Sequence, residues 1–195
     1  MNWSPFDVAP IGQRPNEMRL ISTIEGIGDR LRTAAFAELQ AREAFRWAAQ
    51  TFTDAPNELK TTWEYLAQEE DKHLGWLTSR MKALDQPVNG KTVSDQLWHS
   101  LISCQSAKQF CSFMATAEER GRRAGERFKE AMKSFDPESA KIFGQIALEE
   151  VRHIEVAKQF FGDDVTARSS QNLLPLVHEE VEHLPLVRQE LRSER

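Results

Sequence analysis

Apolar residues recur at intervals of three and four along four long segments of the chain, while the alternating pattern of strands is almost absent. This periodicity predicts an all-α protein. The first long helix is expected roughly from Ile27 to Phe52, with a shorter helical turn after Pro15. A break follows at Pro56, because a proline is tolerated in a first helical turn but not inside a helix. The second long helix should then run to about Leu84.

Residues 85–95 are rich in turn formers and predict a connection rather than a continued helix. Further along, Asp136 suits an N-cap, Pro137 suits the first helical position, and Gly162 suits a helix end. After the connection, the expected helices are a short one at about Leu97–Ile102, a third long one at about Ala107–Ser134 and a fourth from Pro137 to about Phe161.

The length of 195 residues favours one domain, since domains commonly hold about 100–200 residues. We expect a four-helix bundle with a short N-terminal extension over residues 1–165. Residues 166–195 would form a C-terminal tail, with room for a short helix between Pro175 and Pro185.

Composition narrows the class of protein. Hydrophobic residues make up 40% of the chain and charged residues 28%, as in a folded globular protein. The net charge of -5 gives no overall field that would attract nucleic acid or an anionic membrane. Neither a secretory signal nor an apolar run near the ~18 residues of a membrane span is present, so we expect a cytoplasmic protein. Cys104 and Cys111 do not form a Cys-x-x-Cys motif and are expected to be buried apolar residues.

The two pairs of long helices resemble each other at an offset of 80 residues, which indicates an internal repeat. In the first helix of each pair, the identical residues are Ala35, Ala37, Glu38, Arg42 and Ala44 against Ala115, Ala117, Glu118, Arg122 and Ala124. In the second helix they are Ala67, Glu69, Glu70 and His73 against Ala147, Glu149, Glu150 and His153. Each half therefore offers one glutamate and, 32 residues later, a Glu-x-x-His motif.

The Glu-x-x-His spacing has a chemical consequence. Residues three apart on a helix share a face, so the glutamate and histidine of each motif can reach one interior point. Four carboxylates and two imidazoles form the ligand set of di-iron and di-manganese helical bundles. Such a set suits two iron ions, or manganese, better than zinc. The predicted metal ligands are Glu38, Glu70, His73, Glu118, Glu150 and His153.

Two other acidic positions compete for this role. Glu119 adjoins Glu118, but the offset of 80 aligns Glu118 with Glu38 and leaves Glu119 opposite an apolar residue. The tail segment Glu180–His183 also has the Glu-x-x-His spacing, yet no upstream glutamate pairs with it, so we interpret it as a solvated acidic segment. A structural network without metal is the alternative for the main set, although four clustered carboxylates without cations would be costly.

Several neighbouring residues are candidates for a supporting role. Glu69 and Glu149 can accept the free imidazole N–H of a histidine ligand across the bundle, or they can be surface carboxylates. Arg42 and Arg122 follow the glutamate ligand of their helix by four residues, so they can pair with it or line the site's entrance. Tyr65 is the only tyrosine; a core aromatic is expected there, with a radical role as the alternative.

The motifs resemble the ferritin-like superfamily, including rubrerythrins, bacterioferritins and oxygenase-type di-iron proteins. More closely, they are similar to an uncharacterised bacterial ferritin-like family related to di-iron enzymes that hydroxylate a modified tRNA base. That resemblance implies a long crossover between helices two and three, matching the 45 residues from His73 to Glu118. The segments that carry it are Glu69-Glu-Asp-Lys-His73-Leu, Leu97-Trp98, Glu118-Glu-Arg-Gly121 and Glu149-Glu-Val-Arg-His153.

These features together favour an oxidoreductase in which two Fe(II) ions reduce O₂ or peroxide and the oxidised centre acts on an organic substrate. No catalytic residue beyond the metal centre is assigned, and a homodimer is expected. The alternatives are an iron-oxidising storage protein and a metal-free structural bundle. Nucleic acid is not an expected partner of this acidic chain, although the resemblance leaves tRNA open. A basic cluster on helix three is expected to form a solvated face interleaved with glutamates, with contact to an anion as the alternative: Arg120, Arg122, Arg123, Arg127 and Lys129.

Overall fold

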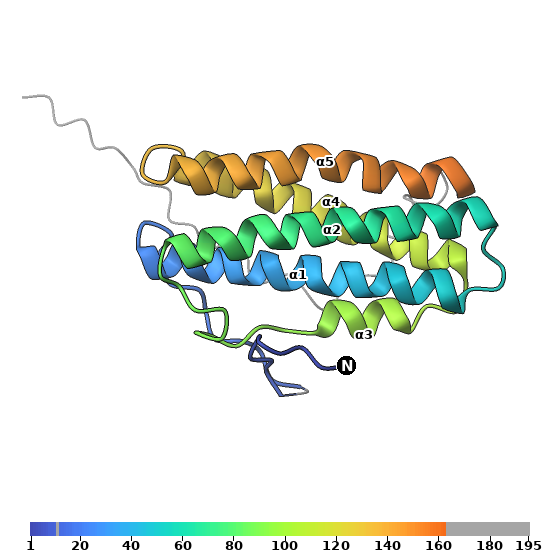
Figure 1. Ribbon diagram of the computed structural model, residues 1–195, viewed down its shortest axis with the longest axis horizontal. Helices are drawn as coiled ribbons and strands as arrows, with labels where there is room; N and C mark the ends of the chain where they lie inside the picture. The colour runs from blue at the N-terminus through green and yellow to red at the C-terminus, as the bar shows by residue number, and fades with distance from the viewer. Residues whose placement is uncertain (11, 163–195) are drawn as a thin grey trace, which may run out of the picture.

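A computed structural model describes residues 1–10 and 12–162 of the chain. Four long helices lie side by side, and a short helix packs along one edge (Figure 1). No strand occurs in the described part of the chain, so the predicted all-α class is confirmed. The predicted tail, with the Glu180–His183 segment, lies outside the described residues. The helices are α1 (Ile24–Thr51), α2 (Asn57–Ala83), α3 (Gln96–Ile102), α4 (Ala107–Met132) and α5 (Pro137–Phe161).

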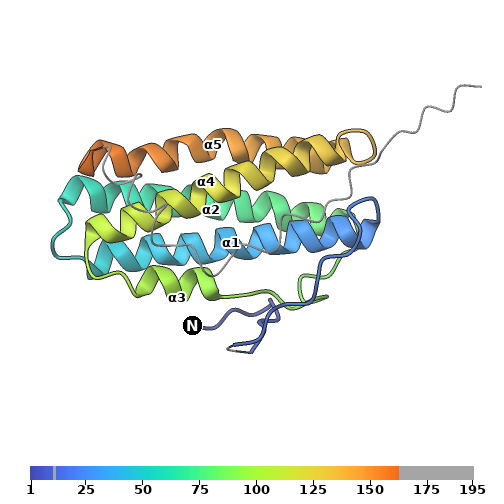
Figure 2. The same cartoon turned by 180° about the vertical axis from the view of Figure 1, so that it is seen from behind.

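The long helices form two antiparallel hairpins. α1 packs closely on α2, and α4 packs closely on α5, while α2 faces α5 and α1 faces α4 across the bundle (Figures 1 and 2). The connection from α2 to α4 runs along the side of α1 and places α3 against it. The predicted bundle with a long crossover between its second and third long helices is therefore confirmed.

Helix starts follow the capping chemistry of the sequence. The Thr23 hydroxyl accepts a hydrogen bond from the backbone N–H of the third residue of α1, and Ser106 does the same for α4. Asp136 caps α5, with Pro137 at its first position as predicted. Each of these caps satisfies a backbone donor that the helix itself leaves unpaired.

The expected helical turn after Pro15 is wrong. Residues 1–10 and 12–23 contain no helix, and α1 starts at Ile24 rather than Ile27. Asp29 accepts hydrogen bonds from both the backbone and the guanidinium of Arg19, which holds this segment against α1. A tertiary contact thus replaces the local helical bonding.

The first hairpin carries a brace built from the N-terminal segment and the crossover. Trp3 packs edge-on against Phe36 of α1 and against Trp98 of α3. Asp29 and Arg32 form an ion pair at 3.0 Å with both side chains 1% exposed. The Arg32 guanidinium also donates to the carbonyl of Pro87 in the crossover.

Core packing differs along the bundle axis. At one end, aromatic rings from α1, α2 and α4 pack together, namely Phe45, Trp47, Phe52, Trp63 and Phe110. Nearer the other end, a Cβ at Gly125 would lie 3.2 Å from the carbonyl oxygen of Phe143, so glycine there allows close approach of α4 and α5. Cys104 and Cys111 are buried among apolar residues, as predicted. Among the described helices, none is long and apolar enough to cross a membrane.

Candidate metal centre

The six predicted ligands meet in the interior of the bundle, between the two hairpins. α1 and α4 contribute one glutamate each, and α2 and α5 contribute one Glu-x-x-His motif each. Two sets of potential ligand atoms each lie within 4.8 Å of one another. The sets are Glu38, Glu70, His73 and Glu150, and Glu70, Glu118, Glu150 and His153. Glu70 and Glu150 belong to both sets, so the arrangement has two neighbouring candidate positions that would share these two carboxylates.

These side chains are withdrawn from solvent. Glu70 and both histidine side chains are fully buried, and Glu150 and Glu118 are nearly so. His153 Nδ1 lies 2.8 Å from Glu70 Oε1 and 3.1 Å from Glu150 Oε2. His73 Nδ1 lies 3.5 Å from Glu150 Oε1 and 3.7 Å from a carboxylate oxygen of Glu38. Such a concentration of carboxylates in the interior needs positive charge to be stable.

The donor atoms fit a pair of cations. Although they lie close to one another, these donor atoms make no hydrogen bond of suitable geometry among the described residues: His73 Nδ1, His153 Nδ1, Glu70 Oε1 and Oε2, Glu118 Oε1 and Glu150 Oε2. Buried polar atoms are normally satisfied, so their shared orientation toward one interior region indicates a bound group. Carboxylate oxygens with one imidazole nitrogen per position suit iron or manganese.

The outer nitrogen of each histidine is held by a carboxylate from the other hairpin. His73 Nε2 lies 2.8 Å from Glu149 Oε2, and His153 Nε2 lies 3.3 Å from Glu69 Oε2. A proton on Nε2 would leave each Nδ1 lone pair free for a metal ion, so these contacts select the binding tautomer. Of the two readings open for Glu69 and Glu149, the geometry favours acceptance of a histidine N–H across the bundle.

A cation stands beside each of these outer carboxylates. Lys72 Nζ lies 2.5 Å from Glu149 Oε2, and Arg152 forms an ion pair with Glu69. Lys72 and Arg152 were not among the predicted site residues, although they are 80 positions apart and differ only in the kind of basic side chain. A search of the repeat for matching charge as well as identity would have found them.

Protonation in this site follows from burial and mutual contact. Burial and the neighbouring carboxylates raise the pKa of Glu38 and of Glu118 well above the ordinary value. Burial alone would lower the pKa of His153, but contacts with Glu150 and Glu70 raise it to about 11. The pKa of His73 is raised in the same way by its three glutamate neighbours. Without bound metal, protons therefore balance much of the carboxylate charge.

Two of the predicted supporting residues, Arg42 and Arg122, pair with carboxylates other than the candidate ligands. Arg42 pairs with Glu43 and with Asp71, and no pair with Glu38 forms in the described structure. Arg122 pairs with Glu119 and Glu126 on its own helix. Both guanidinium groups pair with carboxylates that are at least partly exposed, at lower desolvation cost than a buried carboxylate would require.

The expectation of a core position for Tyr65 is wrong, because the residue is 49% exposed. Its hydroxyl donates a hydrogen bond of 3.4 Å to Glu69 Oε1 and accepts one of 3.3 Å from Arg152. The polar tip of the side chain therefore belongs to the same network as Glu69.

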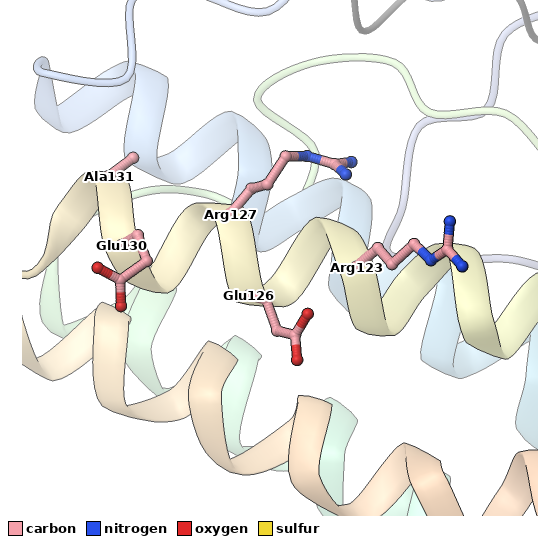
Figure 3. Close-up of a pocket in the computed structure, with 5 residues that line it drawn as sticks. All are labelled: Arg123, Glu126, Arg127, Glu130 and Ala131. Carbon is pink, nitrogen blue, oxygen red and sulfur yellow. The ribbon is translucent and has the colours of Figure 1, made fainter.

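Surface depressions lie on two faces of the molecule. One, of about 310 Å³, lies outside the histidines between α2 and α5, and its lining is Glu69, Lys72, Leu148, Glu149 and Arg152. The other, of about 630 Å³, lies along α4, where Arg123 and Arg127 project away from Glu126 and Glu130 (Figure 3). Its lining contains none of the six candidate ligands, and Arg123 pairs with Glu119, as a solvated charged helix face would.

The fold and the buried glutamate–histidine cluster define a ferritin-like helical bundle with a candidate dinuclear metal site. The chain belongs to the family described as Protein of unknown function (DUF455), whose model matches residues 12–173. Among solved structures, the dodecameric thioferritin related to bacterioferritin from Bacteroides fragilis has a similar fold, with a TM-score of 0.58 and 16% identity. That match covers 78% of this chain and 93% of the thioferritin chain.

Curated relatives are similar over a shorter stretch. The 3-demethoxyubiquinol 3-hydroxylases of Burkholderia thailandensis and Burkholderia vietnamiensis are 28% identical to this chain over 118 residues. The match covers 57% of this chain and 55% of each hydroxylase, so the chain spans about half the length of these relatives.

Proposed function

We propose that this protein is a di-iron oxidoreductase that uses O₂ or peroxide to hydroxylate or oxidise an organic substrate. The observation that carries the proposal is the pair of overlapping ligand sets that share Glu70 and Glu150. The similarity to hydroxylases supports the same reaction class.

The chain's own residues divide the work of holding such a centre. Glu38 and His73 would bind one metal ion, Glu118 and His153 the other, and the remaining two glutamates would bridge them. Bound ferrous iron would supply the electrons for reduction of O₂ or peroxide. Glu149 and Glu69 keep the two imidazole rings in their binding orientation from the opposite hairpin.

The buried position of the site suits oxidative chemistry. Five of the six candidate ligands are buried and the Glu38 side chain is 12% exposed, so an oxidised centre held by them would be largely separated from bulk solvent. We propose an organic substrate that carries an oxidisable ring or C–H group, because hydroxylation is the reaction named for the relatives. A homodimer is the proposed assembly.

Iron oxidation and storage is the second candidate, favoured by the fold similarity to the thioferritin. The two functions differ in particle size and in the fate of the iron. Light scattering of the purified 22.4 kDa chain would show a particle of many subunits for storage and a dimer for the proposed enzyme. A cage that accumulates iron far beyond the ligand sites would overturn the enzyme proposal.

The metal site itself is tested by loading the protein with Fe(II) without oxygen, removing free iron and then admitting O₂. The expected result is about two iron ions per chain, with new near-ultraviolet absorption that develops after O₂ is added. Glu119→Gln is the matched control, because Glu119 adjoins Glu118 but binds Arg122 and Arg123 at the surface. The proposal would be contradicted if the wild-type protein took up no more iron than a variant that carries both Glu70→Gln and Glu150→Gln.

A further inference from the structure

The two halves of the repeat differ at one position in the network outside the histidines. Tyr65 of α2 and Gln145 of α5 are 80 positions apart, and each donates a hydrogen bond to the glutamate four residues further along its helix. Gln145 donates a hydrogen bond of 2.8 Å to Glu149, and Tyr65 donates one of 3.4 Å to Glu69. An amide can support the carboxylate in one half, so support alone does not require a tyrosine in the other.

Tyr65 connects the surface with the buried site through only one intermediate side chain. The residue is 49% exposed, and its ring lies under the guanidinium of Arg152, whose Cζ is 5.2 Å from the ring centroid. Its hydroxyl contacts Glu69 Oε1, and Glu69 Oε2 is 3.3 Å from His153 Nε2. The phenol thus has a carboxylate proton acceptor and a continuous polar path to a candidate iron ligand.

A phenol is chemically suited to such a place. A phenol in contact with a proton acceptor can lose one electron and one proton together, whereas an amide such as Gln145 cannot be oxidised in this way. Because Tyr65 is half exposed, it adds little to the packing of the core. The same exposure makes the oxidised residue accessible to reductants from solution.

We propose that Tyr65 is a one-electron relay between the metal centre and the surface, an inference that rests on the proposed di-iron function. When O₂ or peroxide has oxidised the centre and no substrate is present, the phenol gives up one electron along Glu69 and His153. Its hydroxyl proton passes to Glu69 and then to solvent. The centre is reduced by one electron, and a neutral tyrosyl radical remains. A soluble thiol or ascorbate returns one electron and one proton to the ring and is itself oxidised.

Trp76 is the competing aromatic residue. Its ring centroid is 5.4 Å from that of His73, and Lys72 Nζ is 5.1 Å from the Trp76 centroid. The indole N–H, however, makes no hydrogen bond to a carboxylate among the described residues, in contrast to the Tyr65 hydroxyl. Proton loss during oxidation is therefore better provided for at Tyr65.

The experiment uses the full chain loaded anaerobically with Fe(II), mixed with O₂ or hydrogen peroxide without substrate or reductant, and frozen at intervals for electron paramagnetic resonance. Because Tyr65 is the only tyrosine, ring-deuterated tyrosine labels it alone. We expect an organic radical signal that narrows on deuteration and disappears when ascorbate is added. Tyr65→Phe keeps the ring, and Tyr65→Gln copies the other half of the repeat; both should lose the signal. Trp76→Phe should keep it.

Iron content measured on every sample separates the possible failures. Equal iron in wild type, Tyr65→Phe and Trp76→Phe shows that loss of the radical is not loss of the site. Iron uptake and O₂ consumption without a radical, or a radical that survives in Tyr65→Phe or ignores deuteration, overturns the relay but leaves the di-iron function standing. Absence of bound iron overturns both proposals.

Discussion

The two helical hairpins carry the same ligands in different surroundings. The α1–α2 hairpin is covered on one side by the N-terminal segment and α3 (Figure 1). Trp3 packs on Phe36, while the buried Asp29 and Arg32 of α1 bind Arg19 and the carbonyl of Pro87. No equivalent brace exists on α4–α5 within the described residues; Gln109, 80 positions after Asp29, is exposed. The ligand geometry therefore needs only the repeated part of each hairpin, and the brace is a separate stabilising addition.

The outer networks of the two hairpins show a finer difference. The Glu149 side chain is 21% exposed and binds Lys72, whereas the Glu69 side chain is 8% exposed and binds Arg152 and Tyr65. Both halves of the repeat therefore pair a glutamate with a basic residue, but the two glutamates differ in exposure and in their other hydrogen-bond partners. Chemically distinct metal positions are expected from this asymmetry.

The largest expected effect is on metal content, and it distinguishes glutamates that belong to both ligand sets from those that belong to one. Glu70→Gln or Glu150→Gln weakens both ligand sets, so metal content should fall from about two ions per chain to well under one. Glu38→Gln and Glu118→Gln each weaken one set, and about one ion should remain. Elemental analysis of purified, iron-loaded variants measures this. Equal loss in all four variants would show that the two positions cannot be filled independently.

The brace is tested by Asp29→Ala. The change leaves the buried guanidinium of Arg32 without its carboxylate partner, which should lower the free energy of unfolding by about 3–5 kcal/mol. The matched change in the other hairpin, Gln109→Ala, removes only an exposed hydrogen bond from the Gln105 backbone N–H and should cost about 0.5–1.5 kcal/mol. Urea unfolding followed by helical circular dichroism compares the two. Similar losses would mean that the hairpins are equally braced.

The next largest effect is expected from substituting Glu149 and Glu69, the carboxylates that contact a histidine of the other hairpin. Glu149→Gln and Glu69→Gln weaken the orientation of His73 and His153 respectively, so affinity for the corresponding metal ion should fall by about 10–100-fold. Titration with a competing chelator measures the two affinities. Gln145→Ala is the control, because its amide touches only the outer oxygen of Glu149. An effect of Gln145→Ala as large as that of Glu149→Gln would argue against histidine orientation as the cause.

Per pH unit, the effect of pH on metal affinity is the smallest. Because contacts with glutamates raise the pKa of His153 to about 11 and also raise that of His73, both side chains favour the imidazolium form at neutral pH in the metal-free protein, with a second proton on Nδ1. A metal ion must displace that proton, so apparent affinity should rise with pH, by about tenfold per unit for each proton released. Calorimetry in buffers of different ionisation enthalpy counts the protons. Affinity that is flat between about pH 6 and 8 would contradict this assignment.

Much of the fold could be predicted from local sequence. Apolar periodicity located the four long helices, and Pro56, Asp136 and Gly162 marked breaks that the structure also has. The α4 helix ends at Met132, two residues before the predicted Ser134, as happens where no strong stop signal is encoded. The predicted extent of the domain and the nature of its tail stay predictions, as does the binding of metal by the six residues.

The sequence by itself determined which side chains share a helix face, because that depends only on spacing along one helix. The 80-residue offset thereby assembled the glutamates and histidines into two equivalent sets before any packing was known. Tertiary structure alone decided which hairpin supplies the partner of each histidine, where Arg42 turns and how far Tyr65 is exposed. Those outcomes depend on the distance and rotation between helices far apart in the chain, which no local pattern encodes.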